Sequence, residues 1–233
     1  MDIIFAHRPD YNTGMEEIVR AFNWLIRKGL ARFWGTSEWT PAKFEEACQV
    51  AERLGLQPPI VEQCQYNMMY RQSFERDFVD IFSRREIGTT IWSPLCGGFL
   101  TGKYNDGKVP EGSRGELMYK KGGHLSRRAD MFFSDENREK TVKIFAGLAA
   151  LAQEIGVTQA QLALAWSLAA WQTSTAILGF SRTSQIDENL DSIALLQKWS
   201  PDLEQKANAI LGNNPSCELD LPESKPTVRK LQI

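Results

Sequence analysis

Short apolar runs alternate with helix-periodic segments along most of this chain. Residues 2–6 form a strand-length run that is apolar after its first residue, of the kind buried on both faces of a parallel sheet. A capping box at Thr13-Gly14-Met15-Glu16 then begins a helix whose apolar positions recur at helical spacing until Gly29. The same order recurs, with further strands expected at residues 31–34, 60–63, 88–92 and 175–178. Five strands alternating with helices predict a parallel α/β fold.

Several helices carry their own boundary signals. Thr40-Pro41 and Ser200-Pro201 each place a capping hydroxyl before a proline at the first helical position, and Thr158 begins a second capping box. The remaining helices are expected over residues 73–84, 137–154 and 184–196.

Two stretches lack this periodicity. Residues 97–135 are rich in glycine and basic side chains, and connections of that length in compact domains are usually functional or mobile. The pairs at 120–121 and 127–128 within it are interpreted as exposed loop charge. Residues 213–233 contain three prolines and no period, so we expect a folded domain over 1–212 and a flexible tail over 213–233.

Composition narrows the function classes. The net charge is −2 and the pI is about 5.8, so nothing in the charge favours nucleic acid or an anionic membrane as a partner. No apolar run approaches the roughly 18 residues that cross a bilayer, and the acidic N-terminus does not resemble a signal peptide. The four cysteines lie far apart without a C-x-x-C pair, which disfavours a zinc site or a disulfide framework. We therefore predict a cytoplasmic protein with reduced thiols, without a metal and without a membrane insertion.

Polar residues follow the predicted strands at their C-terminal ends, where ligands bind in parallel α/β folds. His7 could polarise a substrate carbonyl, or it could be a capping histidine. Ser37 and Gln63, with Asn67, suit the binding of an amide such as nicotinamide carboxamide, although each could equally be a loop hydrogen-bonder. Trp92 could stack on a flat ring or simply pack in the core.

Two segments have the composition of anion sites. In residues 89–104, Pro94 ends the strand and a glycine-rich turn leads to Lys103. Lys103 and Arg114 could contact phosphates or could be solvated. The stronger candidate is Gly179-Phe180-Ser181-Arg182, because glycine admits close approach, a helix N-terminus follows, and arginine can bind a phosphate with two donors. No G-x-G-x-x-G follows any strand, which disfavours a Rossmann fold.

Taken together, these motifs resemble the aldo-keto reductases, in the branch that contains potassium-channel β subunits. The matching segments occur in family order between residue 2 and about residue 212: His7-Arg8-Pro9-Asp10, Trp34-Gly35-Thr36-Ser37-Glu38-Trp39, Glu62-Gln63-Cys64-Gln65-Tyr66-Asn67-Met68, Trp92-Ser93-Pro94-Leu95 through Gly102-Lys103-Tyr104, and Leu178-Gly179 through Glu188-Asn189.

The resemblance implies a (β/α)8 barrel that binds NADPH/NADP+ across the C-terminal ends of its strands and reduces aldehydes or ketones to alcohols. His7 resembles the histidine of the catalytic tetrad, Ser37 and Gln63 the carboxamide ligands, and Trp92 the ring stacked on nicotinamide. By the same resemblance, the pyrophosphate and loop contacts are Ser93, Leu95, Lys103 and Arg114, and the contacts to the 2′-phosphate and adenine come from Gly179, Ser181, Arg182, Gln185, Glu188 and Asn189.

One part of the family pattern is missing from this sequence. The tetrad's aspartate, tyrosine and lysine precede the fourth barrel strand, which residues 2–6 resemble, so the chain is expected to form an incomplete barrel of about five β/α units, strands 4 to 8. Three interpretations follow: a reductase of low activity, an NADP(H)-binding regulatory subunit with a channel-type partner, or a fragment that does not fold alone. Free sheet edges also predict self-association.

Overall fold

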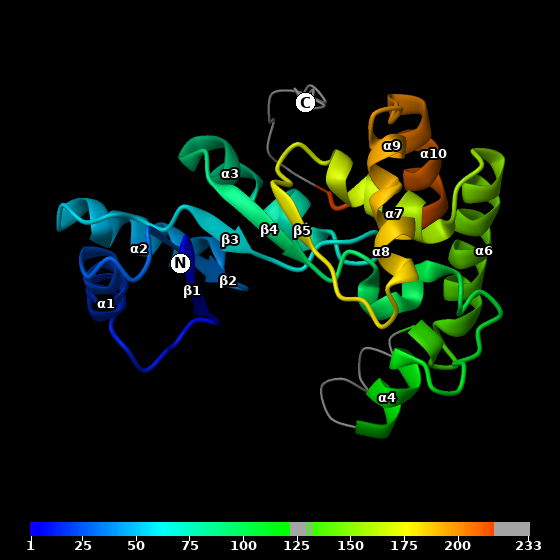
Figure 1. Ribbon diagram of the computed structural model, residues 1–233, viewed down its shortest axis with the longest axis horizontal. Helices are drawn as coiled ribbons and strands as arrows, with labels where there is room; N and C mark the ends of the chain where they lie inside the picture. Colours follow the sequence, from blue (N-terminus) through cyan, green and yellow to red (C-terminus); the bar gives the residue numbers. More distant parts are fainter. Residues whose placement is uncertain (122–129, 131, 217–233) are drawn as a thin grey trace.

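A single parallel sheet organises the computed structural model, which describes residues 1–121, 130 and 132–216. Within these residues the sheet has five strands in the order β1-β2-β3-β4-β5 (Figure 1). Neighbours in space are also neighbours in sequence, which is how consecutive units of a β/α barrel are arranged. The predicted α/β class is therefore confirmed. The strands are β1 (Ile3–His7), β2 (Phe33–Ser37), β3 (Val61–Gln63), β4 (Gly88–Trp92) and β5 (Thr175–Ile177).

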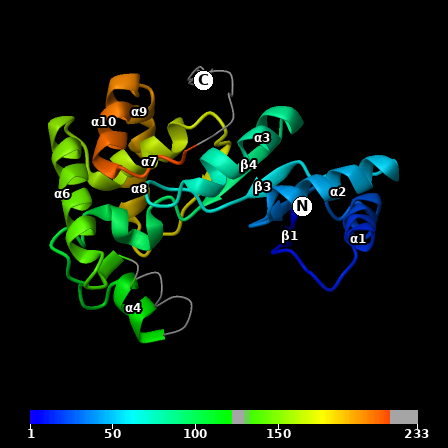
Figure 2. The same cartoon turned by 180° about the vertical axis from the view of Figure 1, so that it is seen from behind.

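Helices connect the strands and form a separate cluster after β4, best seen from the two sides shown in Figures 1 and 2. They are α1 (Met15–Arg27), α2 (Pro41–Arg53), the π-helix η1 (Ser73–Asp77), α3 (Val79–Arg85), the 3-10 helix η2 (Cys96–Thr101), α4 (Arg114–Lys121), α6 (Arg138–Glu154), α7 (Gln159–Ala169), α8 (Ser184–Leu190), α9 (Ser192–Leu196) and α10 (Pro201–Leu211).

Three of the predicted helix caps are confirmed. The hydroxyls of Thr40, Thr158 and Ser200 accept backbone N–H groups in the first turns of α2, α7 and α10. The capping box predicted at Thr13 is wrong: Gly14 is the N-cap of α1, and the Thr13 hydroxyl donates to Asp10 instead. A local Asp–Thr turn competes successfully with the cap, as short polar side chains often do.

Other predicted bounds also differ. The helix expected at 73–84 is divided into η1 and α3, and the helix expected at 184–196 is divided into α8 and α9. The connection 97–135 contains η2 and α4, while 122–129 and 131, with the basic pair at 127–128, lie outside the described residues. Strand β2 begins at Phe33 rather than at residue 31, and it extends beyond the predicted residue 34 because Thr36 and Ser37 pair with both β1 and β3.

The two faces of the sheet differ in burial. Ile4, Ala6, Trp34 and Ile91 pack into the cores formed with the helices. On the opposite face, Ser37 and Val61 are buried in the middle of the sheet, but Phe33 is 39% exposed and Ile177 is 43% exposed. We call this the inner face. The prediction that the strands are buried on both faces is therefore wrong at the exposed positions of the inner face, such as Phe33 and Ile177.

Two separate hydrophobic cores lie on the helix-covered face. A small core joins β1, β2, α1 and α2 and contains Ala6, Met15, Val19, Trp34, Trp39, Ala47 and Ala51. The main core spans β3, β4 and the helices that follow, and it also takes Phe44 and Cys48 from α2. Its fully buried members include Phe74, Phe99, Phe145, Leu148 and Leu162. The small core and its elements are called the N-terminal unit below.

The described cysteines, Cys48, Cys64 and Cys96, are buried and form no disulfide with one another. Burial raises the pKa of the Cys48 thiol to about 12 and the pKa of the Cys64 thiol well above its ordinary value. Cys217 lies outside the described residues. Such thiols are poor nucleophiles, so they belong to the packing rather than to any chemistry.

No single described helix is long and apolar enough to cross a membrane, although α6 and α7 reach that length together with a 91° bend between them. Helix α7 owes its apolar composition to burial in the main core. After α10, Asn213 and Asn214 are held by hydrogen bonds to the loop after β3, and residues 217–233 of the predicted tail lie outside the described residues.

Candidate functional site

The polar residues predicted at the strand ends form one continuous row. His7 pairs in register with Ser37, and Ser37 pairs with Gln63. Trp92 ends β4 and is joined to the segment after β3 by a bridge to Gln65. The structure therefore brings His7, Ser37, Gln63 and Trp92 to the same edge of the sheet, as the sequence predicted.

Backbone strain marks the same edge. The residues directly after β1, β2 and β4 are Arg8, Glu38 and Ser93, with φ values of 67°, 55° and 57°. Non-glycine residues in the left-handed region cost of order 1–3 kcal/mol each and gather at functional sites. Interstrand bonds hold two of them in place, because Arg8 N donates to the Ser37 carbonyl and Glu38 N donates to the Gln63 carbonyl.

Glu38 links three strand ends and was not singled out from the sequence. Its Oε1 accepts from the Trp92 indole N–H at 2.7 Å and from the backbone N–H of Gln65 at 2.6 Å, while Oε2 pairs with Arg8 at 3.3 Å. The indole is thus fixed by a charge-assisted bond, which is stronger than a neutral one. In the sequence, the one indication of this role was that a carboxylate directly follows the polar end of β2.

Ser37 and Gln63 keep part of their hydrogen-bonding capacity for a ligand. The Ser37 hydroxyl donates to the Gln63 carbonyl at 3.0 Å, which leaves its oxygen able to accept. The Asn67 side chain, by contrast, is buried and occupied by the loop: it donates to the Ser93 carbonyl and accepts from the N–H groups of Met69 and Tyr70. Asn67 therefore supports the site indirectly, by holding the loop after β3 against the turn at Ser93.

A buried acid lies directly behind this row. Glu62 is fully buried, and its carboxylate accepts from the Thr36 hydroxyl and from Trp39 N. Burial is the main reason that the pKa of Glu62 is raised to about 7, with the nearby Glu38 carboxylate adding to the effect. Sequence inspection did not identify this group, because a glutamate within a strand has no motif of its own.

After β5, three hydrogen-bond donors converge on one oxygen atom. The N–H groups of Ser181 and Arg182 and the Ser181 hydroxyl converge on Gln185 Oε1, at 2.9, 3.2 and 3.2 Å. One side-chain oxygen thus occupies the position at which these donors would bind a phosphate oxygen. No described carboxylate pairs with the exposed Arg182 guanidinium. The donor set fits the 2′-phosphate of NADP(H).

The remaining predicted contacts lie on either side of this group of donors and after β4. Gly179 and Glu188 are exposed, and Asn189 is buried. The turn at Ser93 and Leu95 is closed by Gly97 N and Gly98 N. Lys103 follows η2 and Arg114 begins α4, both exposed, so their approach to a cofactor remains a prediction.

Comparison with known proteins identifies the fold family. The model of the aldo/keto reductase family matches residues 1–205. The chain belongs to the aldo/keto reductase family.

The relatives found among curated proteins confirm the branch that the motifs indicated. The chain is 40% identical over 215 residues to a probable voltage-gated potassium channel subunit beta of Arabidopsis thaliana and 39% identical to one of Oryza sativa subsp. japonica. It is 41% identical over 216 residues to a putative one of Schizosaccharomyces pombe. Each match covers 92% of this chain but only 60–63% of the relative, so the chain spans about three fifths of the length of these proteins.

Proposed function

We propose that this chain is the NADP(H)-binding part of an aldo-keto reductase-type oxidoreductase that reduces aldehydes or ketones to alcohols. The observation that carries the proposal is that His7, Ser37, Gln63 and Trp92 lie in one row at the C-terminal ends of the strands. The group of donors that converges on Gln185 Oε1 follows β5 of the same sheet. The cofactor, when bound, supplies the hydride. The chain's own residues bind and orient it.

Each residue has a distinct role in this proposal. Trp92, held by Glu38, offers its ring to the nicotinamide, while Ser37 and Gln63 hold the carboxamide and so select which face of the ring is presented. Ser181 and Arg182 bind the 2′-phosphate that distinguishes NADPH from NADH. His7 orients the substrate carbonyl by donating a hydrogen bond to its oxygen.

The proposal includes the position of these units in the whole fold. The five β/α units correspond by resemblance to strands 4 to 8 of a (β/α)8 barrel. The tetrad aspartate, tyrosine and lysine then come from the other three units. A general acid contributes about 10² to 10⁴ in rate, so we expect this chain alone to show little carbonyl reduction.

A second candidate is a regulatory subunit that binds NADP(H) without useful turnover and assembles with a channel-type partner in the cytoplasm. The observation that favours it is the naming of all three relatives as potassium channel β subunits. Both candidates require the cofactor site and differ in turnover.

The cofactor preference tests the proposed site directly. Quenching of tryptophan fluorescence is titrated with NADPH and with NADH, using the wild-type chain, Arg182→Ala and the control Arg32→Ala. Arg32 is exposed beside the start of β2, at the opposite end of the strands. We expect NADPH to bind at least tenfold more tightly than NADH in the wild type and in the control, and the difference to shrink in Arg182→Ala. Equal affinities in the wild type would refute the site.

Turnover distinguishes the two candidates. The purified 233-residue chain is assayed with NADPH and a panel of aldehydes and ketones, with Trp92→Ala as the background control. Residual reduction that disappears in Trp92→Ala supports the reductase. Cofactor binding without any turnover, even after addition of the part of the Arabidopsis relative that lies outside the match, supports the regulatory subunit.

A further inference from the structure

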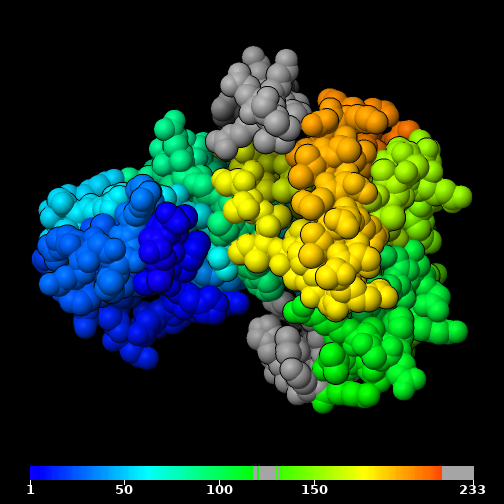
Figure 3. Space-filling model, viewed as in Figure 1, coloured from blue at the N-terminus to red at the C-terminus, as the bar shows by residue number. Residues whose placement is uncertain are grey.

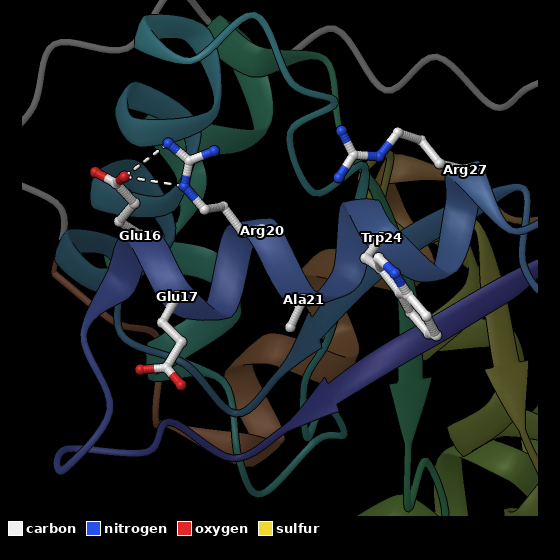
Figure 4. Close-up of a pocket in the computed structure, with 6 residues that line it drawn as sticks. All are labelled: Glu16, Glu17, Arg20, Ala21, Trp24 and Arg27. Carbon is white, nitrogen blue, oxygen red and sulfur yellow. Dashed lines mark hydrogen bonds and ion pairs between the residues drawn. The ribbon is translucent and has the colours of Figure 1, made fainter.

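Glu62 is a buried carboxyl group that has no cation beside it. Carboxylates on the surface of this chain often form ion pairs, and Figure 4 shows one of them, in which the Arg20 guanidinium is bonded to Glu16. By contrast, Glu62 is fully buried, and none of the arginine, lysine and histidine residues that the structure describes pairs with it. A buried charge without a partner is costly, so a glutamate at this position is more than a packing residue.

The burial of Glu62 follows from its position between the two hydrophobic cores. Its carboxylate accepts a hydrogen bond from Trp39 N, and Trp39 belongs to the small core. Cys64 belongs to the main core, and the pKa of its thiol is raised by burial and, to a lesser extent, by the Glu62 charge. Figure 3 shows the N-terminal unit, in blue, to one side of the remainder, and β3, which contains Glu62, runs between them in Figure 1. The two cores therefore keep water away from this carboxyl group.

Glu62 supports the turn that carries Glu38. Its carboxylate accepts from the Thr36 hydroxyl and from Trp39 N, which lie two residues before and one residue after Glu38. Glu38 itself has a φ of 55°, and a non-glycine residue keeps such a conformation only where its surroundings hold it. The Glu38 carboxylate in turn accepts from the Trp92 indole N–H at 2.7 Å. One turn therefore connects the buried carboxyl group to the ring of Trp92.

Negative charge is thereby placed beside the indole of Trp92. A hydrogen bond from the indole N–H to a carboxylate adds electron density to the ring, whose face already attracts cations. The Glu38 charge is partly offset by Arg8 at 3.3 Å, but Arg8 is exposed, so solvent weakens its effect. The Glu62 charge has no such counterpart, and charges interact most strongly where water is excluded.

The other groups near Glu62 do not cancel its charge. Burial is the main cause of its raised pKa, and the Glu38 carboxylate raises that pKa further. Cys64 remains a neutral thiol because its own pKa is raised. The charges at the start of α2 are paired away from Glu62, Lys43 with Glu46 and Glu45 with Arg85.

We propose that Glu62 and Glu38 together raise the affinity of the site for NADP+, whose nicotinamide ring is cationic, relative to NADPH, whose ring is neutral. This inference rests on the proposed function, because it requires the nicotinamide to stack on Trp92. Transfer of a hydride to a carbonyl carbon, with a proton to its oxygen, leaves positive charge on the nicotinamide ring, so the same carboxylates stabilise that charge as it develops. Glu62 touches neither cofactor nor substrate, and it is a positioning residue that acts through Glu38.

The preference for NADP+ should depend on pH. Glu62 is protonated below about pH 7 and ionised above it, so NADP+ gains affinity as the pH rises, while the neutral ring of NADPH responds little. By linkage, binding of the cationic ring favours the ionised carboxylate and releases protons. The 2′-phosphate titrates at about pH 6 in both forms of the cofactor, so its effect cancels in the ratio of their dissociation constants.

The test measures both forms of the cofactor with the full 233-residue chain. Quenching of tryptophan fluorescence gives the dissociation constants of NADP+ and NADPH at about pH 6 and about pH 8.5. We expect the ratio of the NADPH constant to the NADP+ constant to rise by about fivefold or more over this range in the wild type, and to stay constant in Glu62→Gln. Glu45→Gln, which removes a carboxylate from α2 instead, should behave as the wild type does.

Proton release gives a second measurement. Calorimetry in buffers of different ionisation enthalpy, at about pH 7, should show that the wild type releases more protons on binding NADP+ than on binding NADPH. The two releases should be equal in Glu62→Gln. Because the wild-type comparison needs no variant, it holds even if a substitution prevents folding, which circular dichroism would show.

Glu38→Gln tests the connection to Trp92. Its affinity for NADP+ relative to NADPH should fall at every pH, and the midpoint of the pH dependence should move down, because Glu38 no longer raises the pKa of Glu62. A pH-dependent ratio that persists in Glu62→Gln would assign the effect to His7 and overturn the proposal. Tight binding of both forms with a constant ratio in the wild type would overturn this inference alone, whereas binding of neither form would refute the proposed function with it.

Discussion

At the scale of single residues, the burial of Glu62 makes the stability of the fold depend on pH. Its carboxyl is fully buried behind the row of strand-end residues, and burial raises its pKa from 4.5 to about 7. The charged form is bonded only by Thr36 and by backbone N–H groups, which do not replace the water it has lost.

The sign of the pH dependence follows from this shift. Below about pH 4.5, Glu62 is protonated in both folded and unfolded chains and contributes no dependence. Between 4.5 and 7 the unfolded chain releases the proton and the folded chain keeps it, so the free energy of unfolding falls as the pH rises, by up to about 3 kcal/mol. Above about 7 the loss is complete and constant.

Substitution of Glu62 tests this directly. Glu62→Gln imitates the protonated form, since its amide can donate to the Thr36 hydroxyl and accept from Trp39 N. We predict that the variant is about 1–3 kcal/mol more stable than wild type at pH 8 and no more stable at pH 5, measured by urea unfolding at a series of pH values.

Glu45→Gln is the matched control. Arg85 lowers the pKa of Glu45, so this carboxylate stabilises the fold above its unfolded pKa and loses that contribution as the pH falls. Its substitution should destabilise the chain at pH 8, in the opposite direction to Glu62→Gln. Parallel stability curves for wild type and Glu62→Gln would contradict the assignment.

At the scale of elements, Arg71 connects the loop after β3 to the end of the chain. Its guanidinium is buried, forms two bonds to Glu75, and stacks over Trp166 of α7 at 5.0 Å. It also donates to the side chains of Asn213 and Asn214. The segment that follows α10 is thus held by a residue that lies about 140 positions earlier in the sequence.

Removal of this cation should release the segment. We predict that Arg71→Met lowers the free energy of unfolding by about 3 kcal/mol, because Glu75 is left partly buried without its partner. Amide exchange at residues 213–216 should accelerate at the same time. Urea unfolding and exchange mass spectrometry measure the two effects.

A double variant separates charge from packing. Arg71→Met with Glu75→Gln removes the unpaired charge and keeps an acceptor for the Tyr66 hydroxyl, which bonds to Glu75 at 2.8 Å. More than half of the lost stability should return. A double variant no more stable than Arg71→Met would show that packing on Trp166 carries the effect.

These contacts show which elements a sequence can predict. The caps at Thr40, Thr158 and Ser200 and the bounds of β4 depend on neighbours within a few residues, and they were predicted correctly. The break in the helix after residue 73 and the bonds from Arg71 to Asn214 depend on packing between distant elements, which no local pattern encodes.

The same distinction holds for the site. The sequence alone predicts that His7, Ser37, Gln63 and Trp92 lie together, because parallel strands bring their C-terminal ends to one edge of the sheet. Glu38 was not predicted as a site residue, because its contacts with Trp92 and Arg8 form only after three strands assemble. The open inner face was missed because Phe33 and Ile177 have the same apolar pattern whether or not another element covers them.

At the scale of the whole molecule, the two hydrophobic cores differ in size, and we expect the parts of the chain that surround them to differ in stability. The N-terminal unit packs seven buried residues of its own, and the main core contains the larger cluster. Strands β2 and β3 join the two through a register of two residue pairs, and α2 reinforces the junction, because Phe44 lies in the main core and Arg85 of α3 pairs with Glu45. Figures 1 and 2 show the N-terminal unit projecting from the rest of the molecule.

We therefore predict that the N-terminal unit opens before the main core unfolds. Amides of β1, α1, β2 and α2 should exchange with solvent faster than those of β4, α6 and α7, because regions with fewer buried contacts open at lower free energy. Val19→Ala, which removes two methyl groups from a fully buried side chain, should cost about 2 kcal/mol and accelerate exchange more than tenfold within the N-terminal unit alone. Leu148→Ala in the main core should accelerate exchange throughout the chain, since the N-terminal unit has no support once the main core opens. Equal acceleration of both regions by Val19→Ala would mean that the two cores unfold as one, coupled through α2, which contributes side chains to both cores, and through the ladder between β2 and β3.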